Sequence, residues 1–385
     1  LNQACMDLIK GLSIDPDGKT KKTPAPKGPR ASCCTYYNRS HKLISRFQSE
    51  MHDMEDLVTE SNVLLACPYY ASREMASEAN LIFTPYNYLI DPFIRDAMGI
   101  ELSGAIVIID EAHNIEDSAR DAGSITFNLN DIEVIQSELL GLLYNRNTSE
   151  SYLAYEASGI NEGGLKYFSE HSCLIVFVKS ISSFMQNMTN YNIVEFEKKS
   201  KTFKGQEILV AMTEISITKE NLIEYQNALK VLIAANDSPD NSEGSDGLQE
   251  GYSRVLSIHA CRSLEKIFWI LQNILGDNTP HLADYVMVAT ETIKRTTGNH
   301  RGKSSHSTNA ELVKELSLWL LSPNVIFQEL SKHCKSIILT SGSLSPLQSF
   351  QSELGTKFLD IVEAPHIIQS GQVWSGVVSQ APNGL

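Results

Sequence analysis

The stretch that decides the fold is Gly104-Ala-Ile-Val-Ile-Ile-Asp-Glu-Ala-His113, in which an apolar run ends abruptly in two carboxylates. The run from Ala105 to Ile109 is too short for a helix and rich in β-branched residues, so it predicts a buried parallel strand. Ligands of open α/β sheets bind just beyond the carboxyl ends of the strands. Asp110 and Glu111 are therefore expected at a sheet edge where a nucleotide would bind.

The two carboxylates match the Walker B element of phosphate-loop ATPases in its DEAH spelling. In such enzymes an Asp at the strand end holds Mg²⁺, and a following Glu polarises the attacking water. An ordinary alternative exists, because acidic residues also favour the first turn of a helix and four-letter motifs arise by chance. The apolar run before the motif favours an ATP-driven motor, and the rest of the chain has to decide.

Composition narrows the class of protein. The chain has 385 residues, of which 42% are hydrophobic and 20% charged, as in a globular protein of two or three domains. No apolar run approaches the ~20 residues that a membrane span needs. The net charge of −14 argues against a free-standing polyanion-binding segment. The sequence has neither an initiator Met nor a Gly-x-x-x-x-Gly-Lys-Ser/Thr loop, so we expect an internal piece of a longer protein.

Hydrophobic periodicity predicts two further short strands and a long helical block. The strands are Ala79–Thr84 and Ser336–Thr340. Helices are expected over 41–65 and 85–98, after a cap at Asn128 or Asn130, and over 165–188, 219–235, 252–275 and 310–321. The polar segments 19–30, 237–250 and 294–307 are interpreted as solvated loops. The helical block is either an insertion between neighbouring strands of one RecA-like domain or the sign of two unrelated domains.

Seven cysteines occupy positions 5, 33, 34, 67, 173, 261 and 334. Those at 173, 261 and 334 have apolar neighbours, so we expect them to be buried as small hydrophobic residues. The first four lack a Cys-x-x-Cys pair, which disfavours a zinc ribbon. An iron–sulfur cluster, held by four thiolates, remains an alternative for this group.

Several runs, taken in order, resemble the iron–sulfur superfamily 2 helicases of the xeroderma pigmentosum group D (XPD) type. The resemblance covers nearly the whole chain and is weakest in the helical middle. Its motifs are Cys34-Thr-Tyr-Tyr, Ala66-Cys-Pro-Tyr-Tyr-Ala-Ser-Arg-Glu74, Ile82-Phe-Thr-Pro-Tyr-Asn-Tyr-Leu89, the stretch 107–120, Ile338-Leu-Thr-Ser-Gly-Ser-Leu-Ser-Pro346, Glu363-Ala-Pro-His-Ile-Ile368 and Gln372-Val-Trp-Ser-Gly376.

The resemblance implies an ATP-dependent DNA helicase that translocates 5′ to 3′ and uses ATP, Mg²⁺ and a [4Fe–4S] cluster. It matches Asp110 to the Mg²⁺ ligand, Glu111 to the water-activating carboxylate and His113 to the link with a second motor domain. Its remaining matches are Thr340, Ser341 and Gly342 in motif III, which couples hydrolysis to DNA movement, and Cys5, Cys34 and Cys67 as cluster ligands, with Cys33 as the alternative to Cys34.

The same resemblance implies an α/β fold, in which an incomplete RecA-like parallel-sheet motor domain 1 is interrupted twice. The expected parts are a partial cluster domain (1–75), the DEAH part of the motor (76–123), a mainly helical arch domain (124–331) and the motif III part (332–385). The fourth cluster cysteine, the Walker A lysine and motor domain 2 are expected outside the segment, so the segment alone should be inactive.

Implied partners are DNA, as a single strand and at a fork or duplex junction, and repair proteins, in the nucleus and away from membranes. Tyr69, Tyr70 and Arg73 either contact single-stranded DNA or pack the cluster domain against the motor. A non-catalytic remnant that binds DNA or protein is the alternative function. An RNA helicase of the DEAH class is a third interpretation, which the cysteines and the large insertion disfavour.

Overall fold

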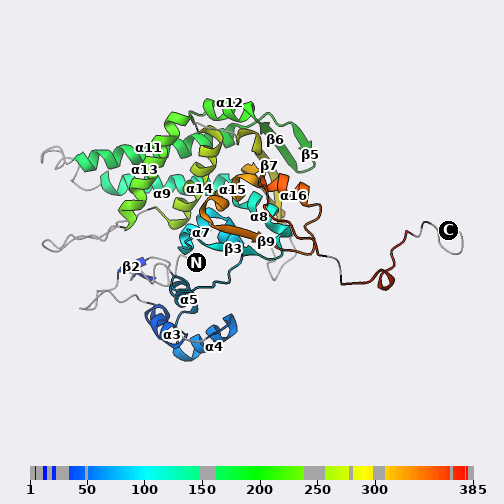
Figure 1. Ribbon diagram of the computed structural model, residues 1–385. Helices are drawn as coiled ribbons and strands as arrows, with labels where there is room; N and C mark the ends of the chain where they lie inside the picture. The colour runs from blue at the N-terminus through cyan, green and yellow to red at the C-terminus, as the bar shows by residue number, and fades with distance from the viewer. Residues whose placement is uncertain are drawn as a thin grey trace.

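The structure is a computed structural model that describes residues 5, 12–14, 20–22, 34–47, 51–147, 162–237, 256–276, 281–297, 308–364, 367–377 and 379. Its main body is a mixed α/β assembly, with a smaller group of helices beside it near the N-terminus (Figure 1). Most of segments 19–30 and 294–307, and nearly all of 237–250, lie outside the described residues.

The N-terminal helices build a small hydrophobic core of their own. After the short antiparallel pair β1 (Leu12–Ile14) and β2 (Thr20–Lys22) come α2 (Thr35–Asn38), α3 (Ser40–Phe47), α4 (Met54–Leu64) and α5 (Pro68–Ala76). Leu43, Phe47, Leu57, Ala66 and Ala71 are buried together and form a cluster separate from the main core. The cysteine-bearing region is thus a folded unit, and the predicted helix over 41–65 is two helices, α3 and α4.

Two parallel strands form the centre of the motor region. The chain passes through α6 (Asn87–Ile90) and α7 (Pro92–Met98) to β3 (Ile106–Ile109), and then to η1 (Ala112–Asn114) and α8 (Ile115–Ala122). Much later, α15 (Asn324–His333) leads into β9 (Ser336–Leu339), which is followed by α16 (Leu347–Leu354) and η3 (Ser370–Gln372). β3 pairs with β9 in parallel register, Ile106 with Ser336 and Ile109 with Leu339. The two strands and their parallel pairing are confirmed, but their complete burial is wrong, because Ile106 and Ile108 are 60% and 62% exposed.

The strand predicted over Ala79–Thr84 is wrong. This segment has no regular secondary structure, and its apolar side chains are exposed, Leu81 by 71% and Phe83 by 91%. A strand needs a hydrogen-bonding neighbour, and among the described residues the parallel sheet consists of β3 and β9 alone. The β-prone composition of the segment therefore has no ladder to join.

Between β3 and β9 the chain builds helices together with a second sheet. The helices are α9 (Leu129–Asn147), α11 (Glu162–Asn187), α12 (Gln206–Glu214), α13 (Lys219–Asp237), α14 (Ile258–Leu275) and the short η2 (Leu282–Asp284). The strands are β4 (Ile125–Asn128), β5 (Ile193–Glu195), β6 (Lys198–Lys204), β7 (Tyr285–Thr297) and β8 (Thr308–Leu320), in the antiparallel order β4-β8-β7-β6-β5. The block is therefore mixed rather than mainly helical.

The helix predicted over 310–321 is wrong, because this segment is strand β8. Its side chains alternate between buried and exposed. Leu316, Leu318 and Leu320 are only 2%, 1% and 2% exposed, whereas Trp319 is 45% exposed. β8 pairs along its length with β7, Tyr285 opposite Leu320 and Thr297 opposite Thr308. This long ladder outweighs the helical preference of Ala, Glu, Leu and Lys in the segment.

The helices over 165–188, 219–235 and 252–275 are confirmed as α11, α13 and α14, and the cap before α9 is Asn128. Its Oδ1 accepts from the backbone N of Asp131 at 2.9 Å, while Oδ2 of Asp131 accepts from the backbone N of Asn128 at 3.4 Å. These reciprocal hydrogen bonds form a capping box, which fixes where the helix begins.

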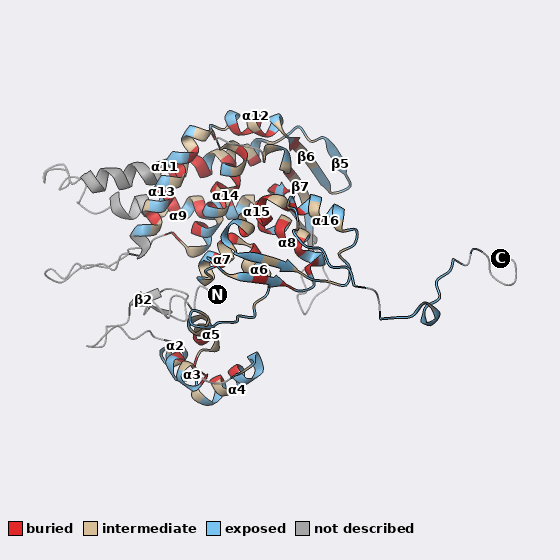
Figure 2. Ribbon diagram, viewed as in Figure 1, coloured by how far each residue is buried: buried red, intermediate tan, exposed pale blue. Residues whose placement is uncertain are grey.

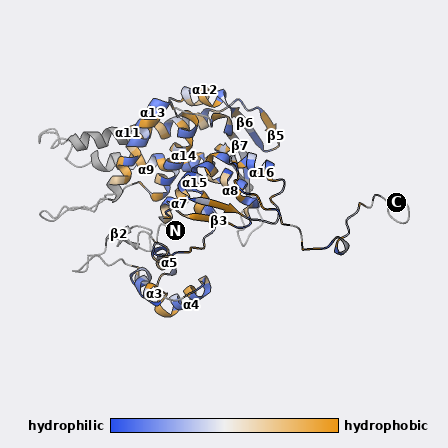
Figure 3. Cartoon of the chain, in the orientation of Figure 1, coloured by the Kyte–Doolittle hydropathy of each residue, from blue (hydrophilic) through white to orange (hydrophobic). Residues whose placement is uncertain are grey.

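One continuous core joins the second sheet and its helices to the region around β3 and β9. Figure 2 shows buried residues concentrated where helices and sheets meet, and Figure 3 shows the hydrophobic character of the parallel strands. Among the described helices, none combines the length and apolar character needed to cross a bilayer. Because this core is continuous, the segment between β3 and β9 packs onto the parallel strands through shared apolar contacts rather than hanging from linkers.

The alternation along β8 generates a stability prediction. Replacing buried Leu318 by Ala should lower the free energy of unfolding by about 2–5 kcal/mol, because the cavity lies in the shared core. Replacing Leu312, which is 55% exposed on the same strand, by Ala should change it by about 0.5 kcal/mol or less. Urea unfolding of both variants measures the difference, and equal losses would contradict the strand assignment.

Candidate nucleotide and cluster sites

The carboxyl end of β3 presents both acidic side chains to solvent. Asp110 and Glu111 are exposed, whereas Ile109 before them and Ala112 after them are buried. Glu111 has a φ of 50°, in the left-handed region, and its backbone N donates to Oδ1 of Asp110 at 3.0 Å. The strand therefore stops in a tight turn that directs two carboxylates outward. Non-glycine residues in this region are uncommon and often mark functional turns.

The ends of β3 and β9 are joined beyond the strands themselves. The backbone N of Thr340 donates to the carbonyl of Ile109 at 2.9 Å, and the backbone N of Ala112 donates to the carbonyl of Thr340 at 3.0 Å. The predicted motif III residues Thr340, Ser341 and Gly342 therefore lie directly beside the DEAH turn. A Cβ added at Gly342 would meet no atom within 4 Å, so the turn borders open space.

The hydroxyl of Ser341 connects the two predicted motifs. It donates to Oε2 of Glu111 at 2.9 Å, and Nδ1 of His113 lies 3.1 Å from the same hydroxyl oxygen. Nδ1 of His113 is also 3.2 Å from Oε2 of Glu111, so the three side chains form a closed triangle. A hydroxyl has one proton to donate, so the imidazole supplies the proton of its own bond to Ser341. The sequence predicted these three residues separately and gave no sign that they touch.

A largely buried ion pair joins α7 to α15, the helix that leads into β9. Nη2 of Arg95 on α7 lies 2.6 Å from Oε1 of Glu329 on α15, and Nη1 donates to the carbonyl of Leu89 at 2.8 Å. The Arg95 side chain is only 7% exposed. The pair fixes the helix that leads into β9 against α7. Sequence reasoning missed this pair, because nothing local marks two residues 234 positions apart as partners.

Cys34 and Cys67 each stand at the start of a short helix. Sγ of Cys34 accepts from the backbone N of Tyr37 at 3.4 Å, so its thiol caps α2. Cys67 is the N-cap residue of α5, and its backbone N donates to the carbonyl of Tyr36 at 2.8 Å.

Cys5 lies near the other two thiols. Burial is the main cause that raises the pKa of the Cys5 thiol, and the charges of Cys34 and Cys67 raise it further. Yet among the described residues no group of three or more His, Cys, Asp or Glu side chains is arranged to hold a metal ion. The assignment of the three thiols as cluster ligands therefore stays a prediction.

The remaining cysteines behave differently. Cys33, the alternative to Cys34, lies outside the described residues. Cys261 is buried, and Cys173 and Cys334 are half-buried and pack against the main core. The predicted burial is confirmed for Cys261, whereas Cys173 and Cys334 are only partly buried.

Residues Tyr69, Tyr70 and Arg73 pack within the protein. The hydroxyl of Tyr69 donates to Sδ of Met98 at 3.2 Å, and Nη2 of Arg73 donates to the carbonyl of Ala97 at 2.8 Å. The rings of Tyr69 and Tyr70 meet edge to face with centroids 5.1 Å apart. Of the two alternatives, packing of the cysteine-bearing helices against α7 is the one that these contacts support.

The parallel strand pair, whose tips carry two carboxylates and a hydroxyl-rich turn, defines the class as a mixed α/β protein. The family model DEAD_2 matches residues 1–132. Over its whole length the chain is 32% identical to the Fanconi anemia group J protein homolog of Gallus gallus, covering 29% of that protein. Over 91% of its length it is 30% identical to the regulator of telomere elongation helicase 1 homolog of Oryza sativa subsp. japonica, covering 33%.

The chain is therefore similar to the XPD-like superfamily 2 helicases. It spans about a third of the length of the curated relatives it matches. A solved structure titled XPD_Helicase aligns over 79% of this chain and 39% of its own, with a TM-score of 0.34 and 16% identity, a similarity too low to add to the argument.

Proposed function

We propose that the full-length protein is an ATP-dependent DNA helicase that moves 5′ to 3′ along DNA and serves repair and genome maintenance in the nucleus. The observation that carries this proposal is the triangle of Glu111, His113 and Ser341. It joins the strand tip that faces the nucleotide to the turn that follows the neighbouring strand. The relatives named above include a helicase of telomere elongation, which favours a DNA substrate over RNA.

In this proposal the exposed carboxylates divide the work at the nucleotide. Asp110 holds the Mg²⁺ that accompanies ATP, and Mg²⁺ neutralises charge on the phosphates when bound. Glu111 polarises the attacking water, and the Ser341 hydroxyl at 2.9 Å fixes the orientation of that carboxylate. Any displacement of the turn after β9 moves this hydroxyl, so a movement elsewhere in the motor that shifts the turn also changes its contact with Glu111.

The proposed domain plan follows the chain. Residues 1–75 form part of an iron–sulfur domain in which Cys5, Cys34 and Cys67 supply three thiolates to a [4Fe–4S] cluster, which serves as a structural centre when bound. Residues 76–123 and 332–385 belong to motor domain 1, and 124–331 form the arch that helps to enclose the separated strand. The partners are single-stranded DNA and a fork or duplex junction, with repair proteins as further candidates. By this plan the segment 1–385 alone hydrolyses no ATP.

The first test replaces Glu111 by Gln in the full-length protein. DNA-stimulated ATP hydrolysis should fall by about 10²–10⁴-fold, because the amide cannot activate water. Glu101→Gln, at an exposed position before β3, is the matched control and should keep the wild-type rate. Hydrolysis that survives in the Glu111 variant would overturn the assignment of this residue.

A second test separates hydrolysis from movement. Ser341→Ala removes the shared hydroxyl, so we expect fewer base pairs unwound for each ATP hydrolysed, with a smaller loss of hydrolysis than in Glu111→Gln. Ser343→Ala is the control, since Ser343 contacts the triangle only through its backbone N, 3.4 Å from Oγ of Ser341. Stopped-flow unwinding and phosphate release, measured together, give this ratio. An unchanged ratio in Ser341→Ala would remove the coupling role.

A third test addresses the cluster. Full-length protein purified without oxygen should contain about four irons per chain and absorb near 400 nm, and Cys67→Ser should lose both signals. Cys173→Ser, at a half-buried position packed against the main core, should keep them. Folded wild-type protein without iron would leave the ATPase proposal standing and refute the cluster.

A further inference from the structure

Strand β6 has a free edge in its second half. β5 pairs only with residues 198–200, and a hydrogen bond from the backbone N of Asn192 to the carbonyl of Ser200, at 3.0 Å, ends the contact. Beyond Ser200 the strand continues to Lys204, paired with β7 on its other side. Within the ranges that the structure describes, no strand lies beside residues 201–204 on the β5 side. We call residues 201–204 the open edge.

The backbone groups of Thr202 point out of the open edge. The backbone N of Ile293 in β7 donates to the carbonyl of Glu197 at 2.9 Å, which fixes the alternation along this ladder. In an antiparallel pair every second residue exchanges hydrogen bonds with the neighbouring strand, so the backbones of Lys201 and Phe203 bond to β7. The N–H and carbonyl of Thr202 are therefore directed away from β7, and no described residue supplies a partner for either.

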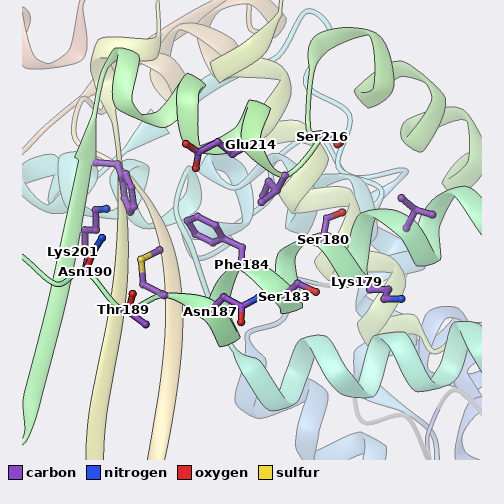
Figure 4. A pocket seen from close by; sticks show the side chains of 14 residues that line it. Lys179, Ser180, Ser183, Phe184, Asn187, Thr189, Asn190, Lys201, Glu214 and Ser216 are labelled. Atoms are coloured by element: carbon purple, nitrogen blue, oxygen red, sulfur yellow. The ribbon is translucent and has the colours of Figure 1, made fainter.

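A cavity lies directly beside the open edge. It has a volume of about 750 Å³ and opens between the C-terminal half of α11, strand β6 and the end of α12 (Figure 4). Lys201 and Phe203 line it from β6, and Lys179 lines it from α11. This volume lies within the range of ligand sites. The cavity therefore gives room for side chains of a further strand added at the open edge.

Three ammonium groups near the open edge are not neutralised. Lys179, Lys201 and Lys204 form no ion pair with any residue whose position is described. Glu214 is the acidic side chain that lines the cavity. The carboxylate of Glu207 accepts from the backbone N of Lys204 at 3.1 Å, which holds it at the first turn of α12. A local excess of cations, on a chain whose net charge is −14, favours an acidic partner at this place.

The open edge favours an extended acidic peptide over other occupants. A peptide can add a strand to an unpaired sheet edge, where main-chain hydrogen bonds supply affinity and side chains supply specificity. Opposite charges on facing residues stabilise such a pair, and like charges destabilise it. A second copy of β6, with four lysines in seven residues, would be repelled. The sugar-phosphate backbone of a nucleic acid has no N–H to donate to the carbonyl of Thr202.

We propose that the open edge binds an extended acidic segment of a partner protein. The segment adds a strand beside Thr202, accepts a hydrogen bond from its N–H and donates one to its carbonyl. Side chains alternate along a strand, so Lys201 faces the cavity and Lys204 faces the other side. Consecutive Asp or Glu residues in the segment therefore meet both ammonium groups.

The open edge is separate from the proposed nucleotide site. In Figure 1, β5 and β6 lie at an outer end of the main body, apart from β3 and β9. A partner can therefore reach the open edge without contacting Asp110 or Glu111. The interaction needs no ATP, so it stands independently of the proposed function.

The first test measures binding of a fluorescein-labelled peptide, Asp-Glu-Val-Asp-Glu-Val-Asp-Glu, to the full-length protein by fluorescence anisotropy. Lys201→Glu with Lys204→Glu should weaken binding about tenfold, because two attractive cross-strand pairs become repulsive. Lys230→Glu with Lys357→Glu is the matched control, since both lysines are exposed and neither lines the cavity. The control pair makes the same charge change and should weaken binding by less than about twofold.

The second part of the test addresses the backbone. Thr202→Pro removes the N–H that points out of the open edge and leaves the hydrogen bonds to β7 in place. Peptide binding should weaken about tenfold, whereas Thr202→Val keeps the N–H and should bind as the wild type does. The same peptide with every backbone amide methylated retains its carboxylates and should not bind. Thermal unfolding checks that each variant folds, and the methylated peptide decides the question if a variant does not.

Four outcomes overturn the proposal. Absence of peptide binding to the wild type removes it outright. Equal weakening by the two lysine pairs means general attraction to a basic surface. Undiminished binding of the methylated peptide, or of the original peptide to folded Thr202→Pro, means that no strand is added. Binding of fluorescein-labelled dT30 that displaces the peptide, and that only the Lys201 and Lys204 pair weakens, assigns the open edge to nucleic acid. Absence of ATP-driven unwinding in the wild type would refute the proposed function and leave this comparison intact.

Discussion

The pairing of β3 with β9 is the constraint on which the rest of the structure depends. Four residues of each strand meet in parallel, although Ile106 and Ser336 are separated by most of the chain. Closing so long a loop costs conformational entropy, although the cost grows only slowly with loop length. The intervening segment reduces that cost by folding into a compact body whose core is continuous with the strands. Without that body, two four-residue strands would contribute too little to stay paired.

The chemistry of the strand tips follows from this pairing. In parallel strands the carboxyl ends point the same way, so a turn after β3 and a turn after β9 meet at one edge. The turn after β3 carries the carboxylates of Asp110 and Glu111, and the Ser341 hydroxyl in the turn after β9 donates a hydrogen bond to Glu111. Ser341 can accept from His113 while donating to Glu111 because a hydroxyl does both. A residue that only accepts or only donates could not close the triangle.

Sequence patterns predicted what is local and missed what depends on distant partners. The β3 and β9 strands, the α11, α13 and α14 helices and the Asn128 cap follow from composition and spacing within short windows. β8 was misjudged as a helix because its thirteen-residue ladder with β7 is invisible locally. The segment 79–84 was misjudged in the opposite direction, since β-prone residues need a neighbouring strand.

The candidate site shows the same division. Motif resemblance singled out Asp110, Glu111, His113 and Ser341, but their contacts come from the strand register. The Arg95–Glu329 pair had no motif at all. It forms where two helices distant in the sequence come together, so only the folded arrangement reveals it.

The contacts also connect the cysteine-bearing helices to the hydroxyl turn. Arg73 on α5 donates to the carbonyl of Ala97 on α7, and Arg95 on α7 binds Glu329 on α15. α15 leads directly into β9, whose end carries Ser341. Breaking a buried ion pair by removing one partner leaves an uncompensated charge, which typically costs about 3–5 kcal/mol. A shift of α5 relative to Ser341 must therefore either break one of these contacts or move α7, α15 and β9 together.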